Sequence, residues 1–408
     1  MAGTEHCMFY VKRKKRYCRM TKKKGEQYCG EHQESFSGVN LDGSKTNCER
    51  VKCPLDPTHT CFKSKLSKHL KVCNAKKLLQ LQPTYIVTGI NLDETSEAPQ
   101  HIPLPELDQS VIDEVIRKVN YAYGKLPEFS EITLQHNVLT NKLNDESCGK
   151  AVKKHLLQNA SLLAHLEESD LIQDNTCYIE FGAGKGKLTY WLGQLIKEKK
   201  NSCILLVDRA SHRHKSDNKL RNEQSPHLIH RIRADIADLN LNNVVEAQKF
   251  ERKVGIAKHL CGAATDLTLK CLVRAMESES EFNVTGLIIA FCCHHRCDYV
   301  SYVGKKYLED CNFSPNEFPI LCSIASWATC GSGLSRTAKR EDHESESRLS
   351  APDSNEREHI GRKVKTLLNW GRLEYLKNAG FKSDLVYYIS TDVSLENMCI
   401  ISTKTSIS

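Results

Sequence analysis

The chain has 408 residues, of which 40% are hydrophobic and 26% are charged, so it can build at least one large core and is not disordered throughout. Its longest apolar stretches, such as 203–207 and 286–293, are far shorter than the roughly 20 residues that span a bilayer, and residues 1–10 lack the apolar run of a secretory signal. These features argue against a membrane-spanning or secreted protein. They predict an intracellular one, in the nucleus, the cytoplasm or both.

Positive charge is concentrated near the N-terminus. The net charge of the whole chain is +8, yet residues 1–80 carry 18 basic and 7 acidic side chains, a net charge of +11. The remaining residues carry 40 basic and 43 acidic side chains and are weakly negative. A polyanion is therefore the expected partner of this basic segment, against the simpler interpretation of a solvated basic tail.

Cysteine is concentrated in the same segment, which holds seven of the 19 cysteines. In a reducing compartment, such a density beside histidines indicates metal binding rather than disulfides. We expect two small zinc modules, over residues 1–36 and 48–78. Each would be a closed structural site whose folding is coupled to metal binding.

The first module offers three thiols and one imidazole in the spacing Cys7-x10-Cys18-x10-Cys29-x2-His32, a complete tetrahedral set for zinc. Basic and aromatic side chains lie between these ligands, and such groups neutralise phosphates and stack on bases. They are residues 12–16, 22–24, Arg19, Phe9, Tyr10, Tyr17 and Tyr28. The alternative is a basic localisation signal without metal.

The second module has the sharper spacing, Cys53-x5-His59-x9-His69-x3-Cys73. A helix expected over 64–72 would place His69 and Cys73 one turn apart on one face. Two thiolates and two imidazoles again form a closed zinc site, and we favour it over an unrelated pair of cysteines and a pair of surface histidines. His6, Cys48 and Cys61 are left without a role.

A connecting region is expected over 79–169, with prolines in its first part and helices over 111–123 and 151–168. From residue 170 to 408, strand-like and helix-like segments alternate, which predicts an α/β domain with a seven-stranded, doubly wound, Rossmann-like sheet. Its strands are expected at 176–181, 202–207, 230–233, 253–257, 286–291, 384–390 and 397–403. The charged segment 334–359 is expected to be a disordered insertion, followed by a helix over 360–379.

A glycine-rich loop follows the first of these strands. The strand ends at Glu180, and Gly182, Gly184 and Gly186 follow before an amphipathic helix begins. Glycines permit a tight turn and let a ligand approach the backbone. A dinucleotide-binding loop is the competing interpretation. The spacing G-x-G-x-G and the acidic residue before it favour S-adenosylmethionine, whose amino group the carboxylate would bind.

Acidic residues also follow the next two strands, Asp208 after the second and Asp235 after the third. Ligands of such sheets bind at the carboxyl ends of the strands. Asp208 would accept hydrogen bonds from the ribose hydroxyls of an adenosine, and Asp235 from the adenine amino group. Each acid alone is more often an exposed loop residue, but three at successive strand ends support a methyltransferase domain.

Two further motifs follow the fourth and fifth strands. They are AKHLCGAATD at 257–266 and IAFCCHHRC at 289–297. Both lie where the methyl acceptor would meet the cofactor. The second could form a third metal site, but adjacent residues at the end of a strand point to opposite faces, so we interpret it as pocket lining.

Together, the CCCH and CHHC modules, the loop IEFGAGKGKL and the motifs KHLCGAATD and CCHHRC resemble the eukaryotic tRNA 2′-O-methyltransferases that act on the fourth nucleotide of the acceptor stem. The resemblance covers nearly the whole chain. It implies methyl transfer from S-adenosylmethionine to a ribose 2′-hydroxyl of tRNA. No membrane or protein partner is indicated.

The reaction implied by the resemblance requires an in-line hydroxyl and a group that removes or stabilises its proton. Lys258, His259, His294 and His295 are the candidates, and the sequence does not choose between them. Two rival classes stay open. One is an RNA-binding zinc protein with an inactive methyltransferase domain, and the other is a methyltransferase of protein or small molecules.

Overall fold

The computed structural model describes residues 6–11, 16–18, 20–22, 25–29, 32, 50–73, 75–76, 82–93, 98–212, 215–223, 225–277, 282–330 and 354–404. Cys48, most basic residues of the first module and residues 334–353 lie outside this set. The chain divides into two compact units, Met1–Gln82 and Pro83–Ser408. Each unit is described by itself.

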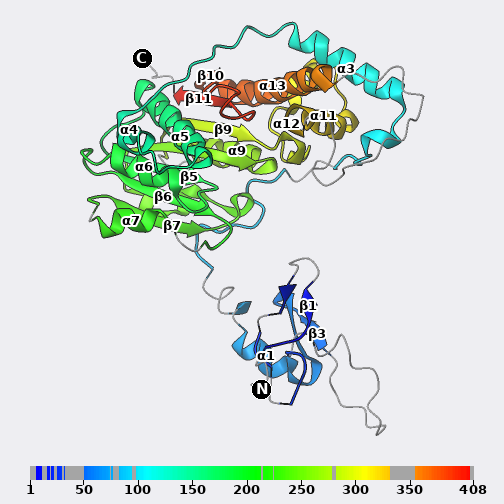
Figure 1. Ribbon diagram of the computed structural model, residues 1–408, viewed down its shortest axis with the longest axis vertical. Coiled ribbons are helices and arrows are strands. Elements are labelled where there is room, and N and C mark those ends of the chain that lie inside the picture. Colours follow the sequence, from blue (N-terminus) through cyan, green and yellow to red (C-terminus); the bar gives the residue numbers. More distant parts are fainter. Residues whose placement is uncertain are drawn as a thin grey trace. The chain divides into compact units, whose positions relative to one another are not determined.

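The described part of the N-terminal unit contains two short hairpins and helix α1 (Figure 1). They are β1 (Tyr10–Val11) with β2 (Arg16–Tyr17), β3 (Arg50–Cys53) with β4 (Asp56–Phe62), and α1 (Leu66–Val72) after a 3-10 turn at Lys63–Lys65. Among its described residues, the buried apolar cluster is Cys53, Cys73 and Ala75, packed by Leu55 and Leu70. A cluster of this size contributes little stability by itself, which fits a module that is stabilised by bound metal.

The second unit contains a seven-stranded sheet in the order β10-β11-β9-β8-β5-β6-β7, which confirms the predicted fold class. Strands β5 to β9 run parallel, whereas β11 runs antiparallel to both of its neighbours. The strands are β5 (Thr176–Phe181), β6 (Cys203–Asp208), β7 (Leu228–Arg233), β8 (Arg252–Cys261), β9 (Val284–Cys292), β10 (Phe381–Tyr387) and β11 (Met398–Lys404).

Helices cover both faces of the sheet because its central strands are apolar on both sides; all six residues of β5 are buried. The helices are α3 (Gln109–Tyr123), α4 (Thr140–Leu143), α5 (Lys150–Glu168), α6 (Lys187–Leu195), α7 (Asp217–Asn222), α8 (Val245–Gln248), α9 (Ala263–Glu277), α10 (Lys305–Asp310), α11 (Phe318–Ala325), α12 (Trp327–Cys330) and α13 (Ser354–Asn378). Short 3-10 turns are Leu104–Glu106, Asn137–Leu139, Ile236–Asp238, Leu241–Asn243, His294–Arg296 and Pro315–Glu317.

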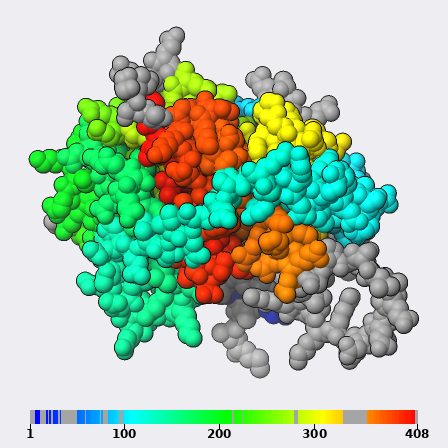
Figure 2. Space-filling view, turned by 90° about the horizontal axis from the view of Figure 1, so that it is seen from above, coloured from blue at the N-terminus to red at the C-terminus, as the bar shows by residue number. Residues whose placement is uncertain are grey.

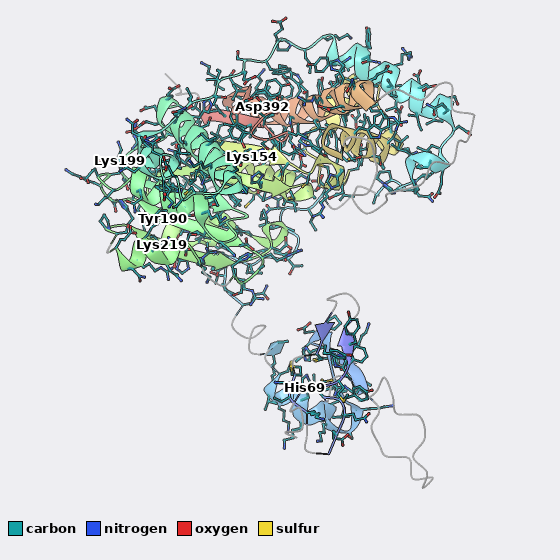
Figure 3. All side chains as sticks on the ribbon, in the orientation of Figure 1. His69, Lys154, Tyr190, Lys199, Lys219 and Asp392 are labelled. Carbon is teal, nitrogen blue, oxygen red and sulfur yellow. The ribbon has the colours of Figure 1, made fainter. Side chains whose placement is uncertain are left out.

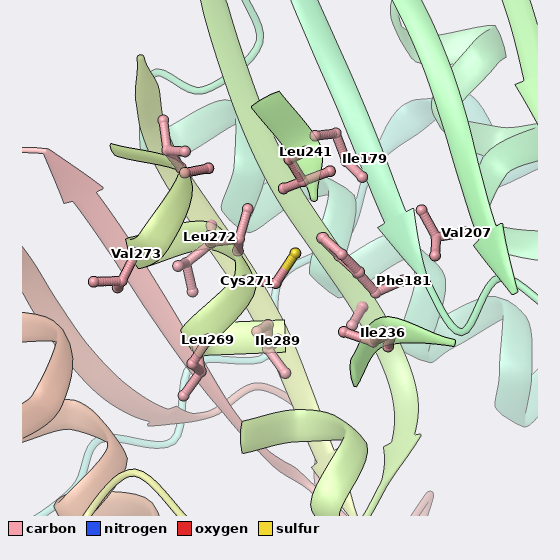
Figure 4. Packing of buried hydrophobic residues seen from close by; sticks show 14 of the residues in the cluster. Ile179, Phe181, Val207, Ile236, Leu241, Leu269, Cys271, Leu272, Val273 and Ile289 are labelled. Atoms are coloured by element: carbon pink, nitrogen blue, oxygen red, sulfur yellow. The ribbon is translucent and has the colours of Figure 1, made fainter. Parts of the chain in front are cut away.

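Two buried clusters hold these layers together. Leu162 of α5 and Leu192 of α6 pack with Tyr178 on one face of the sheet. On the other face, Leu269 and Leu272 of α9 belong to the same cluster as Phe181 (Figure 4). Complete burial of each such side chain contributes about 1.5–3 kcal/mol.

A third cluster lies beside the sheet, where α3 and α10–α12 pack on the first half of α13. In the space-filling view, the cyan segment that contains α3 lies against the orange α13 (Figure 2). Val115 and Val119 of α3 are fully buried against Leu367 and Leu368. The connecting, partly helical region expected over 79–169 therefore belongs, from residue 83 on, to the second unit.

Other contacts support this correction. The Val87 amide donates to the Asp238 carbonyl at 2.8 Å, and the Ile132 amide donates to the Tyr387 carbonyl at 2.9 Å. Helix α5 is also tied to the loop after β10, since the Lys154 ammonium donates to the Asp392 carbonyl at 3.1 Å (Figure 3). These bonds join segments more than 100 residues apart, a separation that local sequence patterns do not report.

All seven predicted strands are present; β5 has the predicted ends, and the ends of the other six differ by a few residues. The C-terminal boundary of the insertion expected over 334–359 was placed too far along the chain, because residues 354–359 already belong to α13. Strand β8 extends past residue 257 to Cys261 and thereby carries the KHLC motif itself. No helix within the described residues is both long enough and apolar enough to cross a bilayer.

Candidate active site and zinc centres

A cavity lies at the carboxyl ends of β5 and β8. The chain leaves β5 for β6 on one side and later returns to β8 on the other, so these two strands form the switch point at which doubly wound sheets bind ligands. The cavity measures about 230 Å³ and is lined by His155, Asn159, Glu180, Gly182, Ala183, Lys185, Lys187, Leu188, Lys258 and His259. A wider hollow of about 710 Å³ near Lys253 lies at the amino ends of β8 and β9, the wrong end for such a ligand.

The glycine loop wraps one side of this cavity. Gly182, Gly184 and Gly186 have φ angles of +64°, +51° and +68°, a region that other residues seldom adopt. A β-carbon on Gly182 would lie 2.8 Å from Leu260 Cδ1, and one on Gly186 would lie 2.7 Å from Asp217 Oδ1. The alternating glycines are therefore required by backbone conformation and by close packing.

Sequence reasoning missed the ion pair that supports this loop. Arg231 of β7 makes a bidentate pair with the buried Asp217, at 3.0 and 2.6 Å, and donates to the Gly184 carbonyl at 3.0 Å. A planar guanidinium suits this task because its donors have fixed directions. In the sequence, Arg231 is visible only as a charged residue within a strand. That signal does not identify Asp217 as its partner.

Glu180 lies at the floor of the cavity and is 5% exposed. Its Oε2 accepts a hydrogen bond from the Thr189 amide at 3.0 Å and another from the Thr189 hydroxyl. Burial raises the pKa of Glu180 to about 7, against the lowering effect of these hydrogen bonds. A cation placed beside it would favour the ionised carboxylate. The residue thus fits the amino group of a cofactor, and Thr189 holds it in place.

Asp208 and Asp235 lie at the ends of two adjacent strands, as expected. Asp208 Oδ2 accepts the Gly184 amide and its Oδ1 accepts the Ala210 amide, both at 2.7 Å. Asp235 caps a 3-10 turn by accepting the Ala237 amide at 3.1 Å. Asp208 therefore holds the glycine loop directly, through the Gly184 amide. Neither Asp208 nor Asp235 is among the residues that line the cavity, and Glu180 is the acid that does.

Lys258 reaches the cavity from β8. Its ammonium donates to Asn159 Oδ1 at 2.6 Å and to the His155 carbonyl at 3.1 Å, both on α5. Burial lowers the pKa of Lys258 to about 7, assisted by the charge of Lys187 and opposed by Glu180. Near neutral pH this side chain is present in both protonation states, a property suited to proton transfer. Asn159 was not predicted, because α5 precedes β8 by about a hundred residues.

His259 also lines the cavity and has a left-handed backbone conformation with φ of +59°. Its Nε2 lies 3.2 Å from Gln158 Oε1. Loss of solvent and the charge of Lys258 lower the pKa of His259 to about 4, so the ring is neutral at physiological pH. With Nε2 facing an amide oxygen, the ring is the donor in that bond.

The other two candidate histidines lie apart from the cavity lining. His294 is 2% exposed and its Nε2 lies 2.8 Å from Asn369 Oδ1. Asn369 also accepts from Arg372, which pairs with Asp266 in the protein interior. His295 is exposed in the same short turn. The structure thus brings Lys258 and His259 to the glycine loop and does not bring His294 and His295 there.

The first set of candidate zinc ligands converges. All ligand atoms of Cys7, Cys18, Cys29 and His32 lie within 4.8 Å of one another. His32 Nδ1 is 3.5 Å from Cys7 Sγ and 3.3 Å from Cys29 Sγ, close to the edge of about 3.5 Å in a tetrahedral zinc site. The His32 ring stacks on Phe9 with centroids 3.9 Å apart, which fixes its orientation.

The second set converges as well, with His69 of α1 facing the hairpin (Figure 3). Cys53 Sγ and Cys73 Sγ are 3.8 Å apart, and His69 Nε2 lies 3.2 Å from Cys53 Sγ. His59 presents Nε2 to the centre and Nδ1 to Asp56 Oδ2 at 3.3 Å, the carboxylate support common for zinc-bound histidines. Both donor sets fit a structural zinc ion in chemistry and spacing.

Three family descriptions match the chain. "Methyltransferase TRM13" covers residues 157–403, "CCCH zinc finger in TRM13 protein" covers 5–33, and "U11-48K-like CHHC zinc finger" covers 50–74. The chain belongs to the TRM13 methyltransferase family. Membership confirms the predicted family, the methyltransferase fold and its S-adenosylmethionine cofactor, and the two zinc modules.

Relatives match over nearly their full length. The "tRNA:m(4)X modification enzyme TRM13 homolog" of Mus musculus is 34% identical over 97% of this chain and 93% of its own. The homologue in Homo sapiens is 33% identical over the same shares, and the enzyme of Scheffersomyces stipitis is 32% identical over 95% and 98%.

Proposed function

We propose that this TRM13 family member transfers a methyl group from S-adenosylmethionine to the ribose 2′-hydroxyl of nucleotide 4 in the acceptor stem of tRNA. The observation that carries this proposal is the near full-length match to relatives named "tRNA:m(4)X modification enzyme". The cavity at the switch point supports it, because residues of the glycine loop and the amine of Lys258 line the same cavity. A tRNA substrate also fits the basic N-terminal unit.

In this proposal, S-adenosylmethionine supplies an electrophilic methyl group when bound. Glu180 would hold its amino group and Asp208 its ribose, with the Gly182–Gly186 turn against the cofactor and Asp235 toward the adenine. Lys258 would accept the proton of the 2′-hydroxyl, because a buried amine with a pKa of about 7 has a substantial neutral fraction. We prefer Lys258 to His259, since the Nε2 of His259 is engaged with Gln158.

Asp208→Ala should weaken S-adenosylmethionine binding by about 10- to 100-fold, because hydrogen bonds to a charged group contribute about 1.5–3 kcal/mol each. The variant also removes the acceptor of the Gly184 and Ala210 amides. Isothermal titration calorimetry on the full chain measures the effect. Asp174→Ala is the matched control, since Asp174 accepts the Lys200 amide at the opposite end of the sheet. Equal affinities for the two variants would contradict the assignment.

The CHHC finger should contribute to tRNA binding. Beside its metal ligands it carries Arg50 and Lys65 against the Phe62 ring, at 4.9 and 5.7 Å, a basic and aromatic surface of the kind that binds RNA. Cys53→Ser should release one zinc ion and reduce tRNA affinity at least about tenfold in fluorescence anisotropy. Cys61→Ser, a buried thiol of the same finger outside the ligand set, should leave both unchanged. An unaltered affinity in Cys53→Ser would refute this role.

The reaction itself is tested by nucleoside mass spectrometry. Full-length protein is incubated with S-adenosylmethionine and a tRNA transcript, and with the same tRNA carrying a 2′-deoxy nucleotide at position 4. We expect one 2′-O-methylated nucleoside from the first substrate and none from the second. Methylation of both would overturn the assigned position. A methylated base instead of ribose would overturn the assigned acceptor atom.

A further inference from the structure

Three cysteines gather at the carboxyl ends of β8 and β9, outside both zinc modules. Cys261 ends β8 and Cys292 ends β9, and the two residues are direct partners in the parallel ladder. The Sγ atom of Cys261 lies 3.3 Å from that of Cys292 and 3.4 Å from that of Cys293. All three sulfur atoms are within 4.8 Å of one another, and none is in a disulfide.

The backbone after β9 makes this cluster possible. Strand geometry alone would send the side chains of Cys292 and Cys293 to opposite faces. The strand ends at Cys292, however, and Cys293 adopts the left-handed conformation, with φ of 51° and ψ of 45°. This turn brings the Cys293 thiol back toward Cys261. The objection that the sequence raised against a metal at this motif therefore does not hold.

We propose that Cys261, Cys292 and Cys293 bind a third zinc ion, with the fourth position open to water. Thiolate is a preferred ligand of zinc, and Zn–S bonds of about 2.3 Å place tetrahedral sulfur atoms about 3.8 Å apart. The finger thiols of the same chain are 3.8 and 4.0 Å apart, so these three are gathered at least as closely. Zinc would bind the three groups as thiolates, and a divalent cation offsets the repulsion between like charges at such distances.

The surroundings indicate what the ion would do. Among the described residues, no fourth cysteine, histidine or carboxylate joins the group, and Cys261 is exposed, so solvent reaches the open position. The loops that carry the ligands touch, because a β-carbon on Gly262 would lie 2.3 Å from the Arg296 carbonyl oxygen. The ion would clamp the end of β8, which carries Lys258 and His259, to the turn after β9.

The carboxylate of Glu396 fixes the third ligand without joining the cluster. Its Oε1 accepts the Cys293 amide at 3.3 Å, and its Oε2 pairs with the Lys365 ammonium at 2.5 Å. The hydrogen bond to its amide helps to hold Cys293 in its left-handed conformation. A positioned ligand loses less conformational freedom when it binds metal.

The test is zinc stoichiometry of the full chain by inductively coupled plasma mass spectrometry. We expect three zinc ions per wild-type chain and two in Cys261→Ser and in Cys293→Ser. Both thiols are at least partly accessible to solvent, so replacing either of them should have a small effect on the stability of the fold. If one variant fails to fold, the other gives the same comparison. Cys311→Ser, a partly buried thiol outside every candidate group, should keep three ions.

Cobalt substitution provides a second readout, because sulfur-to-cobalt charge-transfer absorption grows with the number of bound thiolates. The band should weaken in Cys261→Ser and stay unchanged in Cys311→Ser. Two zinc ions in the wild type would overturn the proposal. So would a stoichiometry unaffected by Cys261→Ser and Cys293→Ser, or a Cys261–Cys292 disulfide found by non-reducing peptide mass spectrometry in place of metal.

Discussion

Lys258→Met should lower turnover by about 100- to 10,000-fold, the usual contribution of a general base. The amine lies in the cavity beside the glycine loop, held at 2.6 Å by Asn159. Methionine has a similar length and no proton acceptor. Steady-state methylation of tRNA measures the loss. Lys253→Met is the matched control, because Lys253 is a buried lysine on the same strand at its opposite end.

The dependence of turnover on pH distinguishes two roles of Lys258, a general base and a stabilising cation. Since the pKa of Lys258 is lowered to about 7, the amine is protonated below this pH and accepts a proton only above it. Turnover should therefore rise as pH increases through about 7 and then level off. Lys258→Arg, which keeps the charge and cannot accept a proton, should be as inactive as Lys258→Met. Near wild-type turnover in Lys258→Arg, or a rate that falls with pH, would exclude the base.

Arg372→Met should lower the free energy of unfolding by about 3–5 kcal/mol, the range for breaking a buried ion pair. The side chains of Arg372 and Asp266 are 1% and 0% exposed and joined by two hydrogen bonds of 3.0 and 2.7 Å. Removing the guanidinium leaves a buried carboxylate without its partner, and also removes a donor to Asn369, the partner of His294. Urea unfolding measures the change.

Two further variants test whether the loss of stability in Arg372→Met comes from the unpaired buried carboxylate. Arg372→Met combined with Asp266→Leu should recover part of the loss, because replacing both charges by apolar groups is often close to neutral. Arg117→Met breaks an exposed pair with Glu114 and should cost no more than about 1 kcal/mol. If Arg372→Met changed stability as little as Arg117→Met, the buried pair would not be a determinant of this fold.

The predictions from sequence succeeded where the signal was local. Strand β5 was placed to the residue, since an apolar run bounded by polar residues and followed by glycines defines it. The ligand sets of both zinc modules were read from spacing, because a tetrahedral ion requires ligands at short, regular intervals. Charge density likewise points to the N-terminal fifth as the site of nucleic-acid binding, which stays a prediction.

Predictions failed, or stopped short, where a residue's partner is distant in the chain. The partner of Lys258 is Asn159 on α5, and His294 is withdrawn from the cavity by Asn369 on α13. The region from residue 83 onward looked like a connection in part because the apolar side chains of α3 pack on helices that appear about 200 residues later. The expectation that adjacent cysteines point to opposite faces does not apply to Cys293, because β9 ends at Cys292 and Cys293 is left-handed.

By itself, the sequence determined the order of strands and helices, the cofactor loop and the residues that can bind zinc, because periodicity and spacing are properties of neighbouring residues. The tertiary structure alone decided which of four basic candidates meets the glycine loop, which acids face the cavity and which thiols converge. These outcomes depend on burial and on pairing between segments far apart in the chain. Such pairing is set by the packing of the whole sheet and not by any one motif.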